Sequence, residues 1–228
     1  MTVVAMRYQT FLFDLDGTLV DTAPDLAAAA NRVRTVRGLP PLPEAELRPY
    51  ASQGAPGLLG KAMNVSNTDP SFSELRAEFL ANYQSAMTVH SCTFTGVIEL
   101  LDRLRAHGIK TGVVTNKYFH LAEALVKDLG LSDRLDLILG SNSEGCAMKP
   151  APDSLLTAAR QLQVQPQTIL YAGDDPRDIQ AAHHAGMLAA SIQWGYGLTD
   201  PHTWEADFVA EKPLDLYLWI LQLNKVDI

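Results

Sequence analysis

Two aspartates near the start of the chain are the residues best placed to do chemistry. Tyr8–Phe13 is apolar and rich in aromatic side chains, as a buried strand is, and Asp14 and Asp16 follow it directly. Residues two positions apart in an extended chain point to the same side. Two carboxylates on one side repel each other unless a cation lies between them. The pair therefore favours a site for a divalent cation over a polar loop that merely leads into a helix.

Further polar residues stand where other strands end or helices begin. They comprise a hydroxyl, an amide, a lysine and three carboxylates: Thr115, Asn116, Lys149, Asp174, Asp175 and Asp178. Open α/β sheets bind their ligands at the carboxyl ends of the strands. Residue types that suit a phosphate and a metal, repeated at four such positions, indicate one shared site.

The elements that must position these residues alternate between strand and helix. Segments typical of buried strands lie at 8–13, 110–115, 168–173 and 188–193, with weaker candidates at 135–139 and 207–210. Helical patterns occupy 97–107, 120–130, 153–163 and 178–186, and several of them close on glycine. This alternation predicts an α/β fold with a Rossmann-like parallel sheet flanked by helices.

The stretch from about Thr22 to Thr93 interrupts the alternation. It opens with Thr22-Ala-Pro-Asp25, the pattern of a capping box with proline in the first turn. Further helices are expected at 43–50, 57–63 and 72–87, and the glycine-containing segment 52–57 is expected to be a flexible loop. We therefore predict an inserted all-helical cap domain over residues 22–93 and an α/β core domain over residues 1–21 and 94–228.

Composition narrows the possible partners. The 228-residue chain has a net charge of −8 and two cysteines, Cys92 and Cys146. An acidic chain does not coat nucleic acid or anionic membrane, and so few cysteines suit a reducing compartment. The apolar start Met1–Arg7 is too short for a signal peptide, and no apolar run is long enough to span a membrane. We expect a cytoplasmic monomer or homodimer with no nucleic-acid or membrane partner.

In chain order, four groups of residues resemble the signature motifs of the haloacid dehalogenase-like (HAD) hydrolase superfamily. They are Asp14-Leu-Asp16-Gly-Thr-Leu, Val114-Thr115-Asn116, Lys149-Pro150, and Gly173-Asp174-Asp175 with Asp178. The resemblance covers nearly the whole chain. It is closest to the phosphoglycolate phosphatase group, which carries a helical cap after the first motif. Segments such as Asp21-Thr-Ala-Pro-Asp25 and Gly173-Asp-Asp-Pro-Arg-Asp178 also look close to N-acetylmuramic acid 6-phosphate phosphatases.

This resemblance implies a Mg²⁺-dependent phosphatase that acts on a small phosphorylated metabolite through an aspartyl-phosphate. Asp14 would attack phosphorus, and Asp16 would protonate the leaving group and then activate water. Lys149 would neutralise negative charge, while Thr115 and Asn116 would bind the transferring group. In the cap, Gln53 and Gly54 are candidate substrate contacts.

The resemblance also implies a metal site and its surroundings. Mg²⁺ would be held by Asp14, by the backbone carbonyl of Asp16 and by Asp174. Asp175 and Asp178 would orient these ligands and Lys149 from outside the coordination sphere. Asp178 could instead only cap the following helix, and Asp175 could face solvent.

Three alternatives to the phosphatase remain at this stage. A sugar phosphomutase would share the nucleophile, the acid/base and the cap. A second alternative is a regulator that binds a phosphorylated metabolite without catalytic activity. Such a protein would lack a catalytic residue in at least one motif, whereas every motif position here carries a residue that can take its catalytic role. Haloacid dehalogenation fits poorly, because that branch of the superfamily lacks the second aspartate present here as Asp16.

Overall fold

The computed structural model describes residues 7–225. The expectation about a signal peptide and the outer limits of the predicted core domain therefore concern residues outside the described part. Within residues 7–225, no helix is both long and apolar enough to cross a bilayer.

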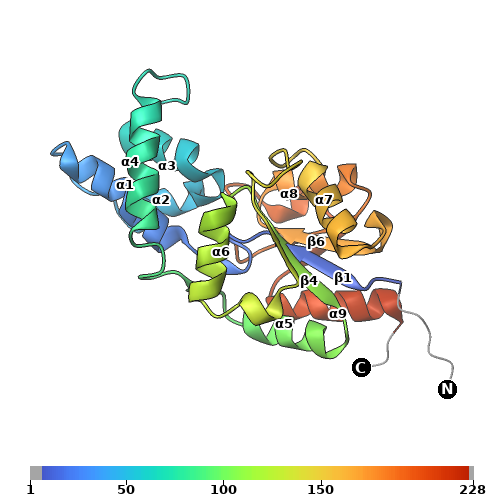
Figure 1. Ribbon diagram of the computed structural model, residues 1–228. Helices are drawn as coiled ribbons and strands as arrows, with labels where there is room; N and C mark the ends of the chain where they lie inside the picture. Colours follow the sequence, from blue (N-terminus) through green and yellow to red (C-terminus); the bar gives the residue numbers. More distant parts are fainter. Residues whose placement is uncertain (1–6, 226–228) are drawn as a thin grey trace.

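A six-stranded sheet forms the centre of the molecule (Figure 1), and each neighbouring pair of its strands is parallel. Its order is β5 (Leu137–Leu139), β4 (Lys110–Val114), β1 (Thr10–Phe13), β6 (Ile169–Gly173), β7 (Leu188–Ile192) and β8 (Phe208–Ala210). The chain extends the sheet from β1 to one side and then returns to extend it on the other. The carboxyl end of β1 thus lies at the switch point, where open α/β sheets bind ligands.

Helices cover both faces of this sheet. One face packs against α5 (Val97–Ala106), α6 (Phe119–Asp128) and α9 (Pro213–Asn224). The other face packs against α7 (Asp153–Leu162) and α8 (Pro176–His184). Side chains alternate along β1, so Phe11 and Phe13 join the first core and Leu12 joins the second. The three short 3-10 helices of this part are Ser132–Arg134, Pro166–Thr168 and Pro201–Thr203.

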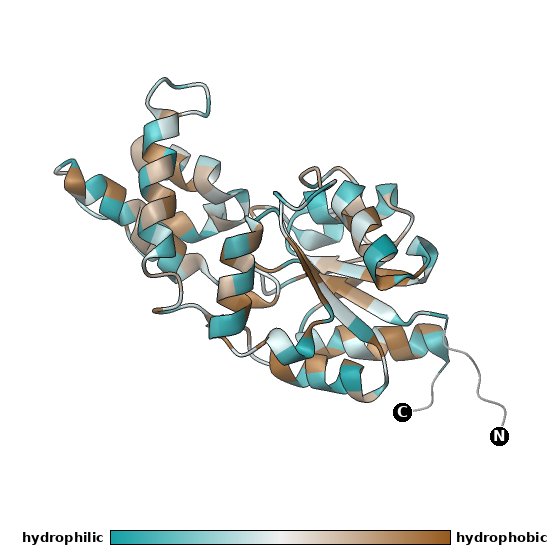
Figure 2. Cartoon of the chain, in the orientation of Figure 1, coloured by the Kyte–Doolittle hydropathy of each residue, from teal (hydrophilic) through white to brown (hydrophobic). Residues whose placement is uncertain are grey.

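The cap consists of helices that lie beside the sheet, at its carboxyl edge (Figure 1). They are α1 (Ala23–Val36), α2 (Glu44–Leu47), the 3-10 helix η1 (Arg48–Gln53), α3 (Gly54–Met63) and α4 (Phe72–Gln84). Their apolar faces enclose a core of their own, in which Phe79 and Tyr83 of α4 meet the alanine-rich side of α1. Hydrophilic and hydrophobic residues are interspersed along these helices, as the hydropathy colouring of Figure 2 shows. The predicted α/β core with a helical insertion is confirmed.

Two short strands join the cap to the core. In this ribbon β2 (Val20–Asp21) pairs antiparallel with β3 (Cys92–Thr93). Beside it, the buried carboxylate of Asp25 accepts hydrogen bonds from the backbone N–H groups of His90 and Ser91, at 3.0 and 2.8 Å. The chain segments that enter and leave the cap are therefore fastened to each other.

Several local expectations were wrong. Thr22 and Asp25 form no capping box, because Thr22 bonds Asp16 and Asp25 bonds the returning chain. The phenolic oxygen of Tyr196 accepts the N–H groups of Thr22 and Ala23 instead, at 2.5 and 3.0 Å. Residues 52–57 are not a loop: η1 runs through Gln53, and α3 begins at Gly54. The ribbon and α9 were not predicted.

The Asn224 side chain fastens helix α9 to the segment that precedes β1. The Asn224 amide accepts from the Tyr8 N–H at 2.8 Å and donates to the Tyr8 carbonyl at 2.7 Å, and both bonds are buried. We expect Asn224→Ala to lower the free energy of unfolding by about 2–4 kcal/mol, because it leaves two buried backbone groups without partners. Urea unfolding measures this change. Asn67→Ala, at an exposed position in the turn before α4, is the matched control and should shift stability by less than about 0.5 kcal/mol. Equal midpoints for the two variants would contradict the assignment.

Candidate active site

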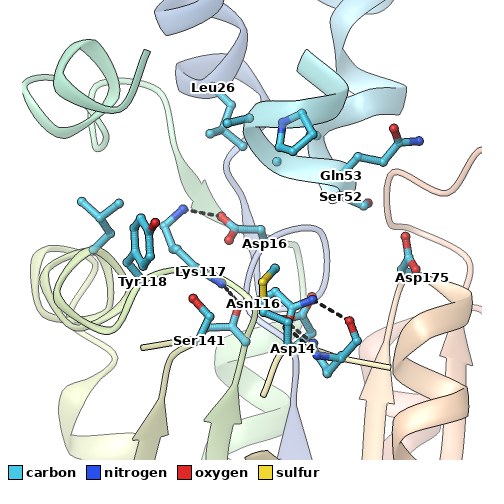
Figure 3. A pocket seen from close by; sticks show the side chains of 18 of the residues that line it. Asp14, Asp16, Leu26, Ser52, Gln53, Asn116, Lys117, Tyr118, Ser141 and Asp175 are labelled. Atoms are coloured by element: carbon cyan, nitrogen blue, oxygen red, sulfur yellow. Dashed lines mark hydrogen bonds and ion pairs between the residues drawn. The ribbon is translucent and has the colours of Figure 1, made fainter. Parts of the chain in front are cut away.

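A cavity of about 550 Å³ lies between the cap and the carboxyl ends of β1 and β4. Figure 3 shows Asp14, Asp16 and Lys117 on its core side, with Leu26, Ser52 and Gln53 facing them from the cap. The predicted residues Gly54, Thr115, Asn116, Lys149, Asp175 and Asp178 also line it. Residues as far apart in the sequence as Asp14 and Asp178 thus meet around one cavity.

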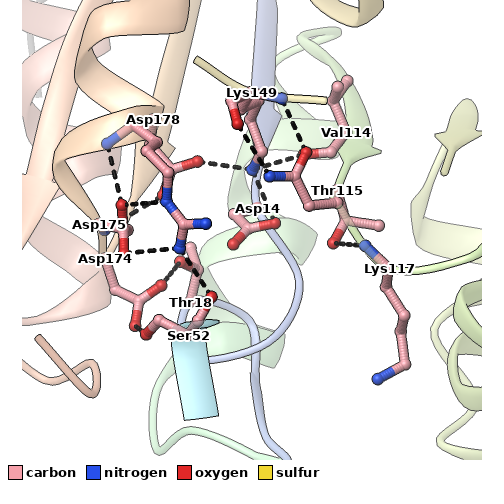
Figure 4. A network of polar contacts seen from close by, with 12 residues as sticks. Asp14, Thr18, Ser52, Val114, Thr115, Lys117, Lys149, Asp174, Asp175 and Asp178 are labelled. Atoms are coloured by element: carbon pink, nitrogen blue, oxygen red, sulfur yellow. Dashed lines mark hydrogen bonds and ion pairs between the residues drawn. The ribbon is translucent and has the colours of Figure 1, made fainter. Parts of the chain in front are cut away.

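Lys149 is the centre of a buried polar network at the end of β1 (Figure 4). Its Nζ lies 2.9 Å from Asp14 Oδ1 and 2.5 Å from Asp178 Oδ1, and it donates to the Tyr171 hydroxyl at 2.7 Å. Only 4% of the residue is exposed. The backbone N–H of Asp14 bonds the Ala172 carbonyl at 2.9 Å, which continues the β1–β6 ladder by one residue and sets the direction of the carboxylate.

The charge of Lys149 is secure despite its burial. Burial lowers the pKa of Lys149, but the carboxylates of Asp14 and Asp178 raise it by more, so the net shift is upward. A protonated lysine against Asp14 at neutral pH can offset the repulsion between this carboxylate and an incoming phosphate dianion.

Three carboxylates converge beside this lysine. Oxygen atoms of Asp14, Asp174 and Asp178 lie within 4.8 Å of one another. Burial raises the pKa of Asp174 well above its usual range, and the charges of Asp14 and Asp178 raise it further. The pKa of Asp178 rises to about 6, first because of burial, although Lys149 opposes the rise. Clustered carboxylate oxygens short of positive charge are a donor set that fits Mg²⁺.

Glycines and hydrogen bonds hold Asp174 in this cluster. A Cβ at Gly17 would lie 2.2 Å from Asp174 Oδ2, and one at Gly195 would lie 2.2 Å from Asp174 Cβ. The carboxylate Oδ2 accepts from the Ser52 hydroxyl at 2.9 Å and from the Tyr196 N–H at 3.0 Å. Because Ser52 belongs to the cap, the cap reaches the predicted metal ligand directly.

Asp16 has a different set of partners. Its Oδ1 accepts from Lys117 Nζ at 2.9 Å and from the Thr22 hydroxyl at 2.6 Å. Among the described residues nothing bonds its Oδ2, although Asp16 lines the cavity. The side chain of Asp16 lies outside the three-carboxylate cluster, so a metal bond from its backbone carbonyl, as the resemblance implies, stays a prediction.

Lys117 is a functional candidate that the sequence analysis did not single out. Its side chain is 7% exposed and also donates to the Tyr83 hydroxyl of the cap at 2.9 Å. Burial lowers the pKa of Lys117, but Asp16 and Tyr83 outweigh this effect and raise it. Lys117 follows Thr115-Asn116 directly. This position just past a strand end was the one feature of the sequence that could have identified Lys117 as a site residue.

Asp175 does not simply face solvent. Its carboxylate caps α8 and binds the Arg177 guanidinium at 2.7 and 2.8 Å, and Arg177 in turn donates to the Ser52 carbonyl at 2.8 Å. Asp178 both completes this capping box, through the Asp175 N–H, and binds Lys149. Asp178 therefore contacts both the helix cap and Lys149, and its role toward a metal stays a prediction.

Asn116 and Thr115 lie where β4 ends. The Asn116 side chain brackets the Lys149 backbone, accepting from its N–H at 2.8 Å and donating to its carbonyl at 3.1 Å. This bracket places Lys149 against Asp14. The Thr115 hydroxyl accepts from the Lys117 N–H at 3.2 Å and is almost fully buried.

Other polar residues of the cap are engaged outside the cavity. Arg48 pairs with Asp21 at 2.6 Å, and Lys61 pairs with Glu46 at 2.9 Å. Neither residue lines the cavity.

Comparison with known proteins identifies the family. The profile of the haloacid dehalogenase-like hydrolase family matches residues 11–192. The chain belongs to this family, as predicted, and the sheet order and the site described above agree with that membership.

The relatives within the family are phosphatases. The chain is 38% identical to the N-acetylmuramic acid 6-phosphate phosphatase of Pseudomonas aeruginosa, over 92% of this chain and 94% of that one. It is 39% identical to the phosphoglycolate phosphatase of Xanthomonas campestris pv. campestris, over 93% and 96% of the two chains. A crystal structure described as a predicted phosphoglycolate phosphatase from Haemophilus somnus superposes with a TM-score of 0.84 at 26% identity, over 94% of this chain and 99% of that one.

The carboxylate cluster yields a test of the metal assignment. We expect MgCl₂ at about 100 times its dissociation constant to raise the melting temperature by roughly 5–10 °C, since only the folded chain assembles the cluster. Asp174→Asn should abolish this rise, whereas Asp133→Asn, at an exposed position in the 3-10 helix Ser132–Arg134, should retain it. Differential scanning fluorimetry at several Mg²⁺ concentrations measures the rise. A full Mg²⁺ response in the Asp174 variant would exclude Asp174 as a ligand.

Proposed function

We propose that this protein is a Mg²⁺-dependent phosphatase that hydrolyses a small organic phosphate monoester through an aspartyl-phosphate on Asp14. The observation that carries the proposal is the position of Asp14. Its carboxylate lies at the open end of the central strand, 2.9 Å from the Lys149 ammonium and within the cluster formed with Asp174 and Asp178. The phosphatase relatives support the same reaction class.

In the first step, an Asp14 carboxylate oxygen attacks phosphorus. The bond between phosphorus and the ester oxygen breaks, and the proton of Asp16 passes to the leaving alkoxide. Lys117 and Thr22 bond Asp16 through Oδ1, so Oδ2 is the oxygen that would carry that proton.

In the second step, Asp16 is an ionised carboxylate and takes a proton from water. The water oxygen attacks phosphorus, the bond between phosphorus and Asp14 breaks, and inorganic phosphate leaves. Both aspartates return to their starting protonation states, so one water is consumed in each cycle.

Charge compensation accompanies both steps. Asp14 and Asp174 would hold a Mg²⁺ ion, which would supply positive charge to the phosphoryl oxygens when bound. Lys149 holds Asp14 in place and adds its own charge, and Asn116 keeps the Lys149 backbone fixed through its two hydrogen bonds. Thr115 and the Asn116 N–H are the proposed contacts of the transferring group.

The cavity favours the larger of the two substrates named among the relatives. In this structure the cap contacts the core through Ser52, Arg177 and Tyr83, and about 550 Å³ still lies between them. A volume of this size is typical of sites for ligands well beyond a two-carbon acid. We therefore propose N-acetylmuramic acid 6-phosphate, with phosphoglycolate as the second candidate. Gln53 and Gly54, at the junction of η1 and α3, are proposed contacts of the leaving group.

The nucleophile assignment has a direct test. Asp14→Asn should lower kcat for p-nitrophenyl phosphate by about 10³-fold or more, because the amide cannot form the covalent intermediate. Asp153→Asn, at the start of α7 and away from the cavity, is the control and should keep wild-type turnover. An Asp14 variant with full activity would end the mechanism. Release of inorganic phosphate without a requirement for a sugar bisphosphate would exclude a phosphomutase.

The substrate assignment is tested by a panel of phosphate esters at fixed Mg²⁺. We expect kcat/KM for N-acetylmuramic acid 6-phosphate to exceed that for phosphoglycolate by about tenfold or more, because the larger leaving group contacts more of the cavity wall. The reverse order would assign the protein to phosphoglycolate.

A further inference from the structure

Among the described residues, one basic side chain that lines the cavity has no carboxylate partner. Four basic side chains line it, and three of them are paired: Lys149 with Asp14 and Asp178, Lys117 with Asp16, and Arg177 with Asp175. The fourth is Arg76. Among the salt bridges between described residues, none involves Arg76.

Arg76 is nevertheless held in place. It extends from α4 of the cap to Tyr118, the residue that precedes α6 of the core, and its Nη2 donates to the Tyr118 hydroxyl at 2.5 Å. The guanidinium carbon lies 5.5 Å from the centre of the Tyr118 ring, a cation–π distance. Both residues are half-buried and line the cavity.

The remaining cavity wall near α4 and α6 is apolar. Phe79 and Leu80 of α4 and Leu121 of α6 line the same cavity. A guanidinium beside apolar surface is weakly hydrated and retains several N–H donors in a fork that matches a carboxylate. The phosphate is already provided for by Lys149, so the free fork suits a second anionic group on the same substrate.

From this geometry we infer that Arg76, oriented by Tyr118, binds a carboxylate on the leaving group of the substrate. The enzyme would thus select phosphate monoesters of carboxylic acids over neutral analogues. The inference rests on the proposed function and names a specificity-determining residue for it. Both substrates named among the relatives, N-acetylmuramic acid 6-phosphate and phosphoglycolate, carry such a carboxylate.

Matched substrate pairs isolate this contact. N-acetylglucosamine 6-phosphate lacks only the lactyl ether of N-acetylmuramic acid 6-phosphate, and ethyl phosphate lacks the carboxylate of phosphoglycolate. The readout is the ratio of kcat/KM for the acid to kcat/KM for its neutral partner. Because both values come from one preparation, a partly unfolded variant leaves the ratio unaffected.

We expect Arg76→Met to lower this ratio by about 10- to 100-fold for at least one pair, mainly through KM, since a charge-assisted hydrogen bond is lost. Arg76→Lys should restore part of it. Tyr118→Phe, which keeps the ring and removes the hydroxyl, should lower the ratio by a smaller factor. Arg32→Met is the control: this exposed cap arginine bonds Asn82 and Ser85 outside the cavity and should leave the ratio at its wild-type value.

Two results would overturn the inference. The first is an Arg76→Met ratio within twofold of wild type for both pairs, in an enzyme that still hydrolyses phosphate esters. The second is an equal loss on the acid and its neutral partner, which would give Arg76 a structural role only. A wild-type protein without activity on any phosphate ester, p-nitrophenyl phosphate included, would instead refute the proposed function itself.

Discussion

The concentration of negative charge at the end of the central strand is the constraint on which the site depends. Asp14, Asp174 and Asp178 converge within 4.8 Å, and the Lys149 ammonium contacts two of them. Such a group is costly to bury unless cations balance it. Part of this balance comes from groups that donate hydrogen bonds to the carboxylates. They are the Lys149 ammonium, the Ser52 hydroxyl and the Tyr196 N–H. A divalent cation would balance the remaining negative charge of this arrangement, and such an ion also binds phosphate oxygens.

The interface between cap and core contains polar pairs that end at the predicted reacting groups. Ser52 reaches Asp174, and Tyr83 reaches Lys117, which holds Asp16. The position of the cap is therefore coupled to the orientation of both the predicted metal ligand and the predicted acid. In several enzymes of other folds, closure of a loop or domain completes a catalytic arrangement and excludes water.

Residues at strand ends were predictable because the pattern that identifies a buried strand also locates its last residue. Asp14, Thr115 and Asp174 were found in this way, and the structure brings them to one edge of the sheet. Pairs between distant segments were not predictable. Lys117 and Asp16 are 101 positions apart, and Tyr196 reaches Thr22 across 174. A sequence states which residues can pair, whereas only the fold selects the pairs.

Local signals also failed where tertiary bonds compete with them. Thr22 and Asp25 have the types and spacing of a capping box, but each side chain finds a stronger partner elsewhere. The glycines of segment 52–57 suggested a loop, yet Gly54 takes a positive φ of 62° and starts a helix. Helix propensity is a weak prior at such positions, because the packing of Leu58 and Leu59 into the cap core decides the outcome.

The two hydrogen bonds between Tyr8 and Asn224 join the start and the end of the described chain, which has a consequence for folding during synthesis. The cap helices are contiguous in sequence, so they can collapse together soon after they leave the ribosome. The central strand, although made earlier, must wait for β4, β6 and finally α9 before its edges and one face are covered. The packing around Phe11 is therefore complete only after α9 has been made, because Trp219 of α9 lies against the Phe11 ring.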